Sequence, residues 1–378
     1  MAAGRCDTAV VAATAGQMLA PTDVLGPMVI GRCQEQGGRP DLAYATYTDF
    51  ARRYPQARGI AGVRALAQLA LRAQATQTAK LAISREATLT TLAPEPSTLA
   101  VLPVTIAGDS SLQPLSRGLA ELITTDLALV RNLRLLERVQ IGTLLDELQL
   151  GASGRADPAT AARVGRLLRA ERMVQGVASI TENGPVRMSA AVVRGNGEVR
   201  AGAQVNGTFK QLLDLEKQLV FGIATQLGIQ LTEAERQRIL REGPKNLTAF
   251  LAYSEGLEAL DRGDYHAAAA SFSAAAHADP SFQQAQQQQQ AAEAAPVVQT
   301  TPGDLVTVVQ AVEQLTTPTE PASVGALQQG TLDVSGTIGD ITGPTGINTI
   351  LSNPTPESQG ISSVVQASGI LRIIFRKP

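Results

Sequence analysis

The sequence predicts an α+β protein: a central mixed sheet of about five strands covered by helices, flanked on both sides by all-α helical hairpins. Two observations carry this prediction. Short apolar or alternating segments, typical of strands, occur between helical patterns in the middle of the chain. Ala- and Leu-rich helical patterns fill the segments before and after that middle part. The expected order of elements over residues 98–230 is β-α-β-α-α-β-β-β-α.

The segment 133–154 contains the clearest unit of one strand followed by one helix. Leu133 and Leu135 alternate with their neighbours, as in a short buried strand. The helix after it carries apolar residues at i, i+3, i+4 and i+7, namely Ile141, Leu144, Leu145 and Leu148. This spacing places the apolar side chains on one helical face, so the helix is expected to pack back onto a sheet.

Other strand and helix signals complete the middle domain. The apolar run at 99–104 predicts a buried strand, and leucines at helical spacing follow it as far as Val130. Asp157 and Pro158 predict the start of another helix, because aspartate caps a helix and proline fits its first position. A long helix over residues 209–227 is expected to close the domain.

Three strands are predicted between residues 172 and 205. Asn183 and Gly184 mark the first turn, because Asn-Gly is the strongest short hairpin signal. A Gly-Asn-Gly triplet at 195–197 marks the second turn. Apolar and small or polar residues alternate along the last two strands, which predicts one buried face and one wetter face.

The two flanking segments are expected to be helical. Residues 5–92 contain Ala-rich helical patterns. Residues 231–295 begin with a capping-box pattern formed by Thr232 and Glu235, and Asn246 is expected to cap the next helix.

After Pro296 the composition shifts to Thr, Pro, Gly, Ser and Val. Residues 296–378 are therefore expected to form a low-complexity tail. The last residues of this tail, 370–378, predict a strand that could pair with a sheet edge in this chain or in a partner.

Composition and charge exclude two classes of protein. The net charge is -2 and no long basic run occurs, so no nucleic-acid partner is expected. No run of about 18 apolar residues occurs, so no transmembrane segment is expected. The first residues lack a basic region followed by an apolar core, so the protein is either cytosolic or given in a trimmed form.

The cysteines Cys6 and Cys33 leave two alternatives open. They are either unrelated small core residues or a disulfide. A disulfide would contribute roughly 3–4 kcal/mol and imply an oxidising compartment such as a periplasm. No histidine or acidic cluster accompanies the cysteines, so no metal site is expected.

No catalytic set is visible in the sequence, so neither an enzyme activity nor a cofactor is expected. The only histidines, His266 and His277, are assigned surface or packing roles, which leaves no Ser-His-Asp or Cys-His arrangement. Glu137, Arg138 and Asp126 would serve an enzyme only if a deep pocket gathered them. The position of Glu137 and Arg138 at a strand end favours solvated or ion-paired side chains.

Residues 98–230 resemble the CsgG-type and TolB-N-terminal-like domains of bacterial envelope proteins. The resemblance rests on LAVLPV (99–104), SRGLAELITTDLALV (116–130), LRLLERVQIGTLLDELQLGASG (133–154) and DPATAARVGRLLRAERMVQGVAS (157–179). It implies a bacterial envelope protein that works by binding other proteins.

The flanks resemble tetratricopeptide repeats. Gly256, Gly263, Tyr265, Ala268, Phe272, Ala275 and Pro280 stand at the offsets of that repeat. A helix that begins at Pro40 resembles the second helix of a repeat, because it closes on Tyr54 and Pro55.

By this second resemblance, the inner helix of the repeat would offer Tyr253, Leu257 and Asp261 to a partner peptide. The alternative is that these three side chains only pack against the neighbouring helix.

The sequence therefore leads to one main hypothesis of function. The protein is expected to be a non-enzymatic, protein-binding accessory or scaffold protein of the bacterial cell envelope, in the periplasm or at the outer membrane. Its expected partners are envelope proteins or peptides, and its setting is secretion or assembly. The alternative is a cytosolic regulatory module with TolB-like and tetratricopeptide domains.

Overall fold

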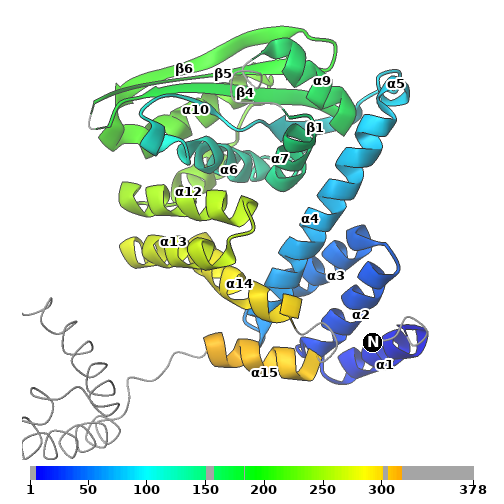
Figure 1. The fold of residues 1–378 in the computed structure, drawn as a ribbon. Coiled ribbons are helices and arrows are strands. Elements are labelled where there is room, and N and C mark those ends of the chain that lie inside the picture. Colours follow the sequence, from blue (N-terminus) through cyan, green and yellow to red (C-terminus); the bar gives the residue numbers. More distant parts are fainter. Residues whose placement is uncertain (1–5, 150–156, 183, 301–304, 317–378) are drawn as a thin grey trace, which may run out of the picture. The chain divides into compact units, whose positions relative to one another are not determined.

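The computed structural model describes residues 6–149, 157–182, 184–300 and 305–316. The chain divides into two units, Met1–Thr316 and Thr317–Pro378, and every described residue belongs to the first. The strand expected at 370–378 lies outside the described residues. The predicted α+β fold class is confirmed, because a mixed sheet occupies the middle of the chain and helices precede, cover and follow it (Figure 1).

Helices alone precede the sheet. They are α1 (Cys6–Leu19), α2 (Leu25–Gln36), α3 (Pro40–Arg53), α4 (Ile60–Ser84) and the short α5 (Glu86–Leu89). Helix α4 is a single helix of 25 residues. Alanines such as Ala61 and Ala65 are buried along α4, so its neighbours approach its backbone closely.

The sheet contains six strands within the described residues. They are β1 (Glu95–Val101), β2 (Thr105–Gly108), β3 (Arg134–Leu135), β4 (Ala170–Ile180), β5 (Pro185–Arg194) and β6 (Val199–Thr208). The order is β3-β1-β4-β5-β6, and β2 also pairs with β4. Strands β1, β2 and β3 form parallel pairs, whereas β4, β5 and β6 form an antiparallel meander, so the sheet is mixed as predicted.

The prediction of one strand over the apolar run at 99–104 is wrong. Strand β1 ends at Val101, and β2 begins at Thr105. Leu102 still donates its backbone N–H to the Val174 carbonyl at 2.9 Å, but Pro103 has no N–H to continue the ladder. The chain resumes pairing with the same strand, β4, further along.

Helices cover both faces of the sheet. They are α6 (Leu115–Ala128), α7 (Arg138–Glu147), α9 (Pro158–Leu168) and α10 (Leu212–Gln226), with 3-10 turns at Ser110–Leu112 and Phe209–Gln211. On β1, Leu99 and Val101 belong to the core formed with α6 and α10. The intervening Ala100 belongs to the core formed with α7, α9 and the end of α4. This strand is apolar at successive positions because both of its faces are buried.

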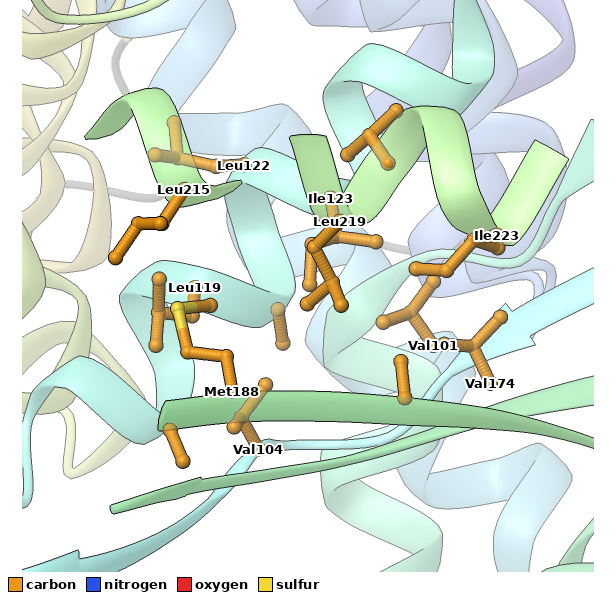
Figure 2. Close-up of a cluster of buried hydrophobic side chains, with 14 of the residues drawn as sticks. Val101, Val104, Leu119, Leu122, Ile123, Val174, Met188, Leu215, Leu219 and Ile223 are labelled. Carbon is orange, nitrogen blue, oxygen red and sulfur yellow. The ribbon is translucent and has the colours of Figure 1, made fainter. Parts of the chain in front are cut away.

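The larger core lies between the sheet and helices α6 and α10. Figure 2 shows Leu119 and Ile123 from α6 and Leu215, Leu219 and Ile223 from α10 above the strands. Val101, Val174 and Met188 contribute from the sheet.

Three capping predictions are confirmed, at the starts of α9, α11 (Glu233–Arg241) and α12 (Leu247–Asp261). Asp157 caps α9 and Asn246 caps α12 through their side-chain oxygens. Thr232 and Glu235 form the predicted capping box at the start of α11. The C-terminal helices are α11 (Glu233–Arg241), α12 (Leu247–Asp261), α13 (Tyr265–Ala278), α14 (Gln283–Thr300) and α15 (Leu305–Thr316).

The expected tail boundary at Pro296 is wrong for the first residues of segment 296–378. Helix α14 continues through Pro296 to Thr300, and α15 forms a further helix. Val298, Val308 and Val312 are buried in the core formed with the N-terminal helices. Burial of these valines offsets the cost of a proline inside a helix, about 3 kcal/mol. Residues 317–378 lie outside the described residues.

Within the described part of the chain, none of the helices combines the length and the apolar character needed to cross a membrane.

Candidate partner-binding site

Two of the three candidate peptide-binding residues lie in the core. Tyr253 is 2% exposed and Leu257 is 1% exposed. The Tyr253 ring packs between those of Phe272 and Phe282, with centroids 5.3 and 4.7 Å away. Burial raises the pKa of the Tyr253 phenol. The structure therefore favours the packing alternative for both residues, with only the edge of Leu257 reaching a cavity.

The third candidate, Asp261, is occupied by two arginines. Its Oδ2 and Oδ1 accept from Nη1 and Nη2 of Arg138 at 2.7 and 3.0 Å, and Oδ2 also accepts from Nε of Arg117 at 2.7 Å. Nε of Arg138 donates to Glu121 at 3.0 Å. Burial acts to raise the pKa of Asp261, but the two guanidinium groups hold it below its ordinary value. We call these four residues the arginine–carboxylate cluster.

The arginine–carboxylate cluster joins three elements far apart in the sequence. Arg117 and Glu121 come from α6, Arg138 from α7 and Asp261 from the end of α12. Arg138 is only 7% exposed, and its bidentate pair with Asp261 has the geometry of a strong charge-assisted bond. Sequence reasoning expected Arg138 to be solvated or ion-paired, and it is ion-paired. The cluster fixes the C-terminal helices to the sheet domain.

Arg138 also lines two cavities. One, of about 430 Å³, lies between α3, α4, α7, α12 and α14, and we call it the interhelical cleft. Its lining includes Tyr44, Arg64, Gln68, Leu71, Leu257 and Gln288. The other cavity, of about 400 Å³, includes Arg72, Thr76 and Gly142 in its lining. The cleft is therefore built by the N-terminal helices, the sheet domain and the C-terminal helices together.

The sequence did not predict a second group of buried charged residues. Asp126 of α6 is 1% exposed, and Glu216 of α10 is fully buried. Lys217 Nζ lies 2.6 Å from Asp126 Oδ2 and 3.5 Å from Glu216 Oε2. We call these three residues the carboxyl–lysine cluster. Glu216 falls four residues after Leu212 and three before Leu219, both inward-facing, so the helical spacing contained the signal for its burial.

Burial raises the pKa of both carboxyl groups in the carboxyl–lysine cluster. Each is opposed by the nearby Lys217 ammonium, but one cation serves two carboxyls. At least one proton is therefore retained near neutral pH. The cluster lies apart from the two cavities, since neither lining contains any of its members.

Both histidines lie at the surface of a C-terminal helix. His266 and His277 are both exposed on α13, and His277 Nδ1 lies 2.8 Å from the Ser273 carbonyl oxygen. Among the described residues, no group of three or more His, Cys, Asp or Glu side chains could hold a metal ion.

Of the two cysteine alternatives, the structure contains the disulfide. Cys6 and Cys33 are bonded, with Cα atoms 5.5 Å apart, and link α1 to α2.

The sheet ends in a long edge strand. In the described residues, β6 pairs with β5 and with no strand on its other side. Its ten residues include no proline and no lysine, the residues that usually protect an edge from pairing with another chain. Gln204 and Asn206 are exposed on it.

Comparison with known proteins finds a family match for the middle segment. Residues 104–204 match the family model described as "Curli production assembly/transport component CsgG". The matched segment runs from just before β2 into β6, so it contains most of the sheet and helices α6, α7 and α9. The predicted CsgG resemblance is thus confirmed for this segment. No curated protein matches the chain.

Proposed function

We propose that the protein is a non-enzymatic scaffold of the bacterial cell envelope that binds other proteins during secretion or assembly. The match of residues 104–204 to a component of curli assembly and transport carries this proposal. In the family, this domain belongs to an assembly and transport component, and we transfer that setting, as a proposal, to the whole chain.

The helical flanks support the scaffold role, because the two hairpins repeat the same contacts. A Cβ on Gly31 would lie 2.2 Å from the Tyr47 ring, and one on Gly256 would lie 2.5 Å from the Phe272 ring. The aromatic residue follows the glycine by the same interval in both (31 to 47 and 256 to 272). We infer that α2–α3 and α12–α13 are two tetratricopeptide-like hairpins, a type of unit that commonly builds surfaces for protein binding.

The Cys6–Cys33 disulfide supports a location outside the cytoplasm, because such bonds persist in oxidising compartments. Fractionation of producing cells, combined with a thiol-reactive label, tests this. We expect the protein in the envelope fraction, with labelling only after reduction. A cytosolic protein whose two thiols react without reduction would support the alternative, a cytosolic regulatory module.

We assign partner docking in the middle domain to the free edge of β6. An extended segment of an envelope protein could add to this edge as a further strand, since its backbone groups have no partner strand within the described residues.

A photo-crosslinking side chain at Gln204 tests the docking edge. We expect crosslinked products from the envelope fraction that disappear when Asn206→Lys places a charge on the same edge. A crosslinker at the exposed Glu233 of α11, and the substitution Gln237→Lys on that helix, are matched controls. Equal products from Gln204 and Glu233, or products that survive Asn206→Lys, would contradict docking at β6.

A further inference from the structure

One side chain in the interhelical cleft is a cation without an anionic partner. Arg64 of α4 donates from Nη2 to the Pro55 carbonyl at 2.9 Å and from Nη1 to Gln290 Oε1 at 3.3 Å. Both acceptors are neutral, and Arg64 forms no ion pair within the described residues. Burial lowers the pKa of its guanidinium, so the group is partly desolvated without compensation.

The carboxylates that line the same cleft do not form ion pairs with Arg64. Glu121 accepts from Arg138 in the arginine–carboxylate cluster. Glu137 accepts from the hydroxyl of Tyr44 at 2.8 Å and is exposed to solvent. A partly desolvated arginine with only neutral acceptors gains most from an added carboxylate, because charge-assisted bonds are roughly twice as strong as neutral ones.

A second unfilled group lies one helical turn further along α4. Gln68 donates its amide N–H to Gln288 of α14, but its Oε1 is buried and has no hydrogen-bond partner in the described structure. Because Arg64 and Gln68 are four residues apart, they lie on the same face of α4. Gln68 lines the cleft, so a peptide N–H would satisfy Oε1 once the amide turned toward the bound segment.

An apolar wall follows in the same direction. Leu71 lies seven residues after Arg64, and Leu257 and Leu260 of α12 line the cleft with it. At 1.5 Å per helical residue, Arg64 and Leu71 are about 10 Å apart along α4, the length of about three extended residues. The cleft thus presents a cation, an amide acceptor and an apolar wall in that order.

We propose that the interhelical cleft binds an extended, acidic segment of a partner protein, with an Asp or Glu carboxylate on Arg64 and an apolar side chain near Leu71. We assign the carboxylate to a side chain rather than a chain end. Capture of a terminal carboxylate uses a nest of backbone N–H groups, whereas the cation and the unpaired acceptor described in this cleft, Arg64 and Gln68, are side-chain groups. This site goes beyond the docking assigned to β6 and does not depend on it.

Fluorescence anisotropy with the full-length protein tests the proposal. The probe is a labelled pool of nonapeptides, capped at both ends, with glutamate three positions before leucine in a Gly/Ser background. We expect binding to the wild type that weakens about tenfold or more in Arg64→Gln and is retained in Arg64→Lys. Arg85→Gln, an exposed arginine at the end of α4 outside the cleft, should bind as the wild type does.

Two further pools identify the chemistry that is recognised. Glutamine in place of glutamate should abolish binding, and a free C-terminal carboxylate on that glutamine pool should not restore it. In Arg64→Glu, a pool with lysine in place of glutamate should bind better than the glutamate pool. This reversed preference keeps the test valid if Arg64→Gln proves unstable.

Several results would overturn the proposal. They are no binding of the glutamate pool by the wild type at millimolar concentration, equal binding of the glutamate and glutamine pools, and wild-type affinity in Arg64→Gln. Recovery of binding by the free C-terminal carboxylate would also reject the side-chain assignment. The β6 variant Asn206→Lys should bind the glutamate pool as the wild type does. The proposals for the cleft and for the β6 edge are therefore tested independently.

Discussion

Helix α6 carries buried charge in two different arrangements. Toward its N-terminal end, Arg117 and Glu121 join Arg138 and Asp261, so two guanidinium groups face two carboxylates. Toward its C-terminal end, Asp126 shares the single Lys217 with Glu216. In the first cluster the two guanidinium groups hold the pKa of Asp261 below its ordinary value, while burial raises the pKa of Glu121; in the second, burial raises the pKa of both carboxyls. Asp261, the carboxyl of the two clusters whose pKa falls, is the one that accepts from two guanidinium groups, so the cations that a buried carboxyl contacts decide whether its pKa falls or rises.

The largest effect on stability is expected from a substitution that breaks the arginine–carboxylate cluster. Arg138→Met leaves Asp261 and Glu121 buried with Arg117 alone, so the free energy of unfolding should fall by about 3–5 kcal/mol. Chemical denaturation measures this.

Arg187→Met is the matched control for that substitution, because Arg187 is exposed on β5. Its effect should stay within about 0.5 kcal/mol. A loss below 1 kcal/mol for Arg138→Met, on the order of a surface ion pair, would show that the cluster adds little to stability.

The carboxyl–lysine cluster predicts that stability depends on pH. Burial, with the charge of Asp126, raises the pKa of the Glu216 carboxyl to about 8 from an ordinary value of 4.5. Between these values the folded state binds more protons than the unfolded state, so stability falls as the pH rises. The free energy of unfolding should drop on the order of 2–4 kcal/mol between about pH 5 and about pH 8.

Glu216→Gln should flatten this pH dependence, because an amide does not titrate and stays neutral as the pH rises. Glu182→Gln, at an exposed position before β5, should leave the slope unchanged. Denaturation curves at a series of pH values provide the measurement. A wild-type stability that is constant from pH 5 to pH 8 is incompatible with a buried, protonated Glu216.

Alanine substitutions at two glycines should have the smallest effect on stability. They test the packing of α6 without changing any charge. A Cβ on Gly118 of α6 would lie 1.9 Å from Ser254 Oγ of α12, so Gly118→Ala must push the two helices apart beside Arg117. We expect a loss of about 1–3 kcal/mol. A Cβ on Gly142 of α7 would meet nothing within 4 Å, so Gly142→Ala should stabilise by about 0.5–1 kcal/mol. Thermal unfolding of both variants checks the sign, and equal signs would contradict the close contact of α6 with α12.

Local sequence signals predicted much of the fold. Apolar runs and alternation predicted each strand of the described residues except β2, which depended on the break that Pro103 makes in an apolar run. The caps at Asp157, Thr232 and Asn246 were predictable because each acts within three residues of its own position. The helices beyond Pro296 were not predictable in this way, because their burial depends on helices near the other end of the chain.

The candidate sites follow the same division. For Tyr253 and Leu257 the sequence left peptide binding and packing as alternatives, and the structure buries both side chains. Asp261 meets Arg138 across 123 positions of sequence, and Arg64 meets Gln290 across 226. No local pattern contains such pairs.

The sequence by itself determined most of the secondary structure, the CsgG-like character of the middle domain and the absence of strong net charge. Each of these depends on residues a few positions apart or on composition. Only the tertiary structure decided how each buried charge is treated. Asp261 is paired with two arginines, and Glu216 has a raised pKa that favours its protonated form. Arg64 has only neutral hydrogen-bond acceptors. The physical reason is that the protonation and binding capacity of a charge depend on its solvent exposure and its neighbours in space, which sequence separation does not give.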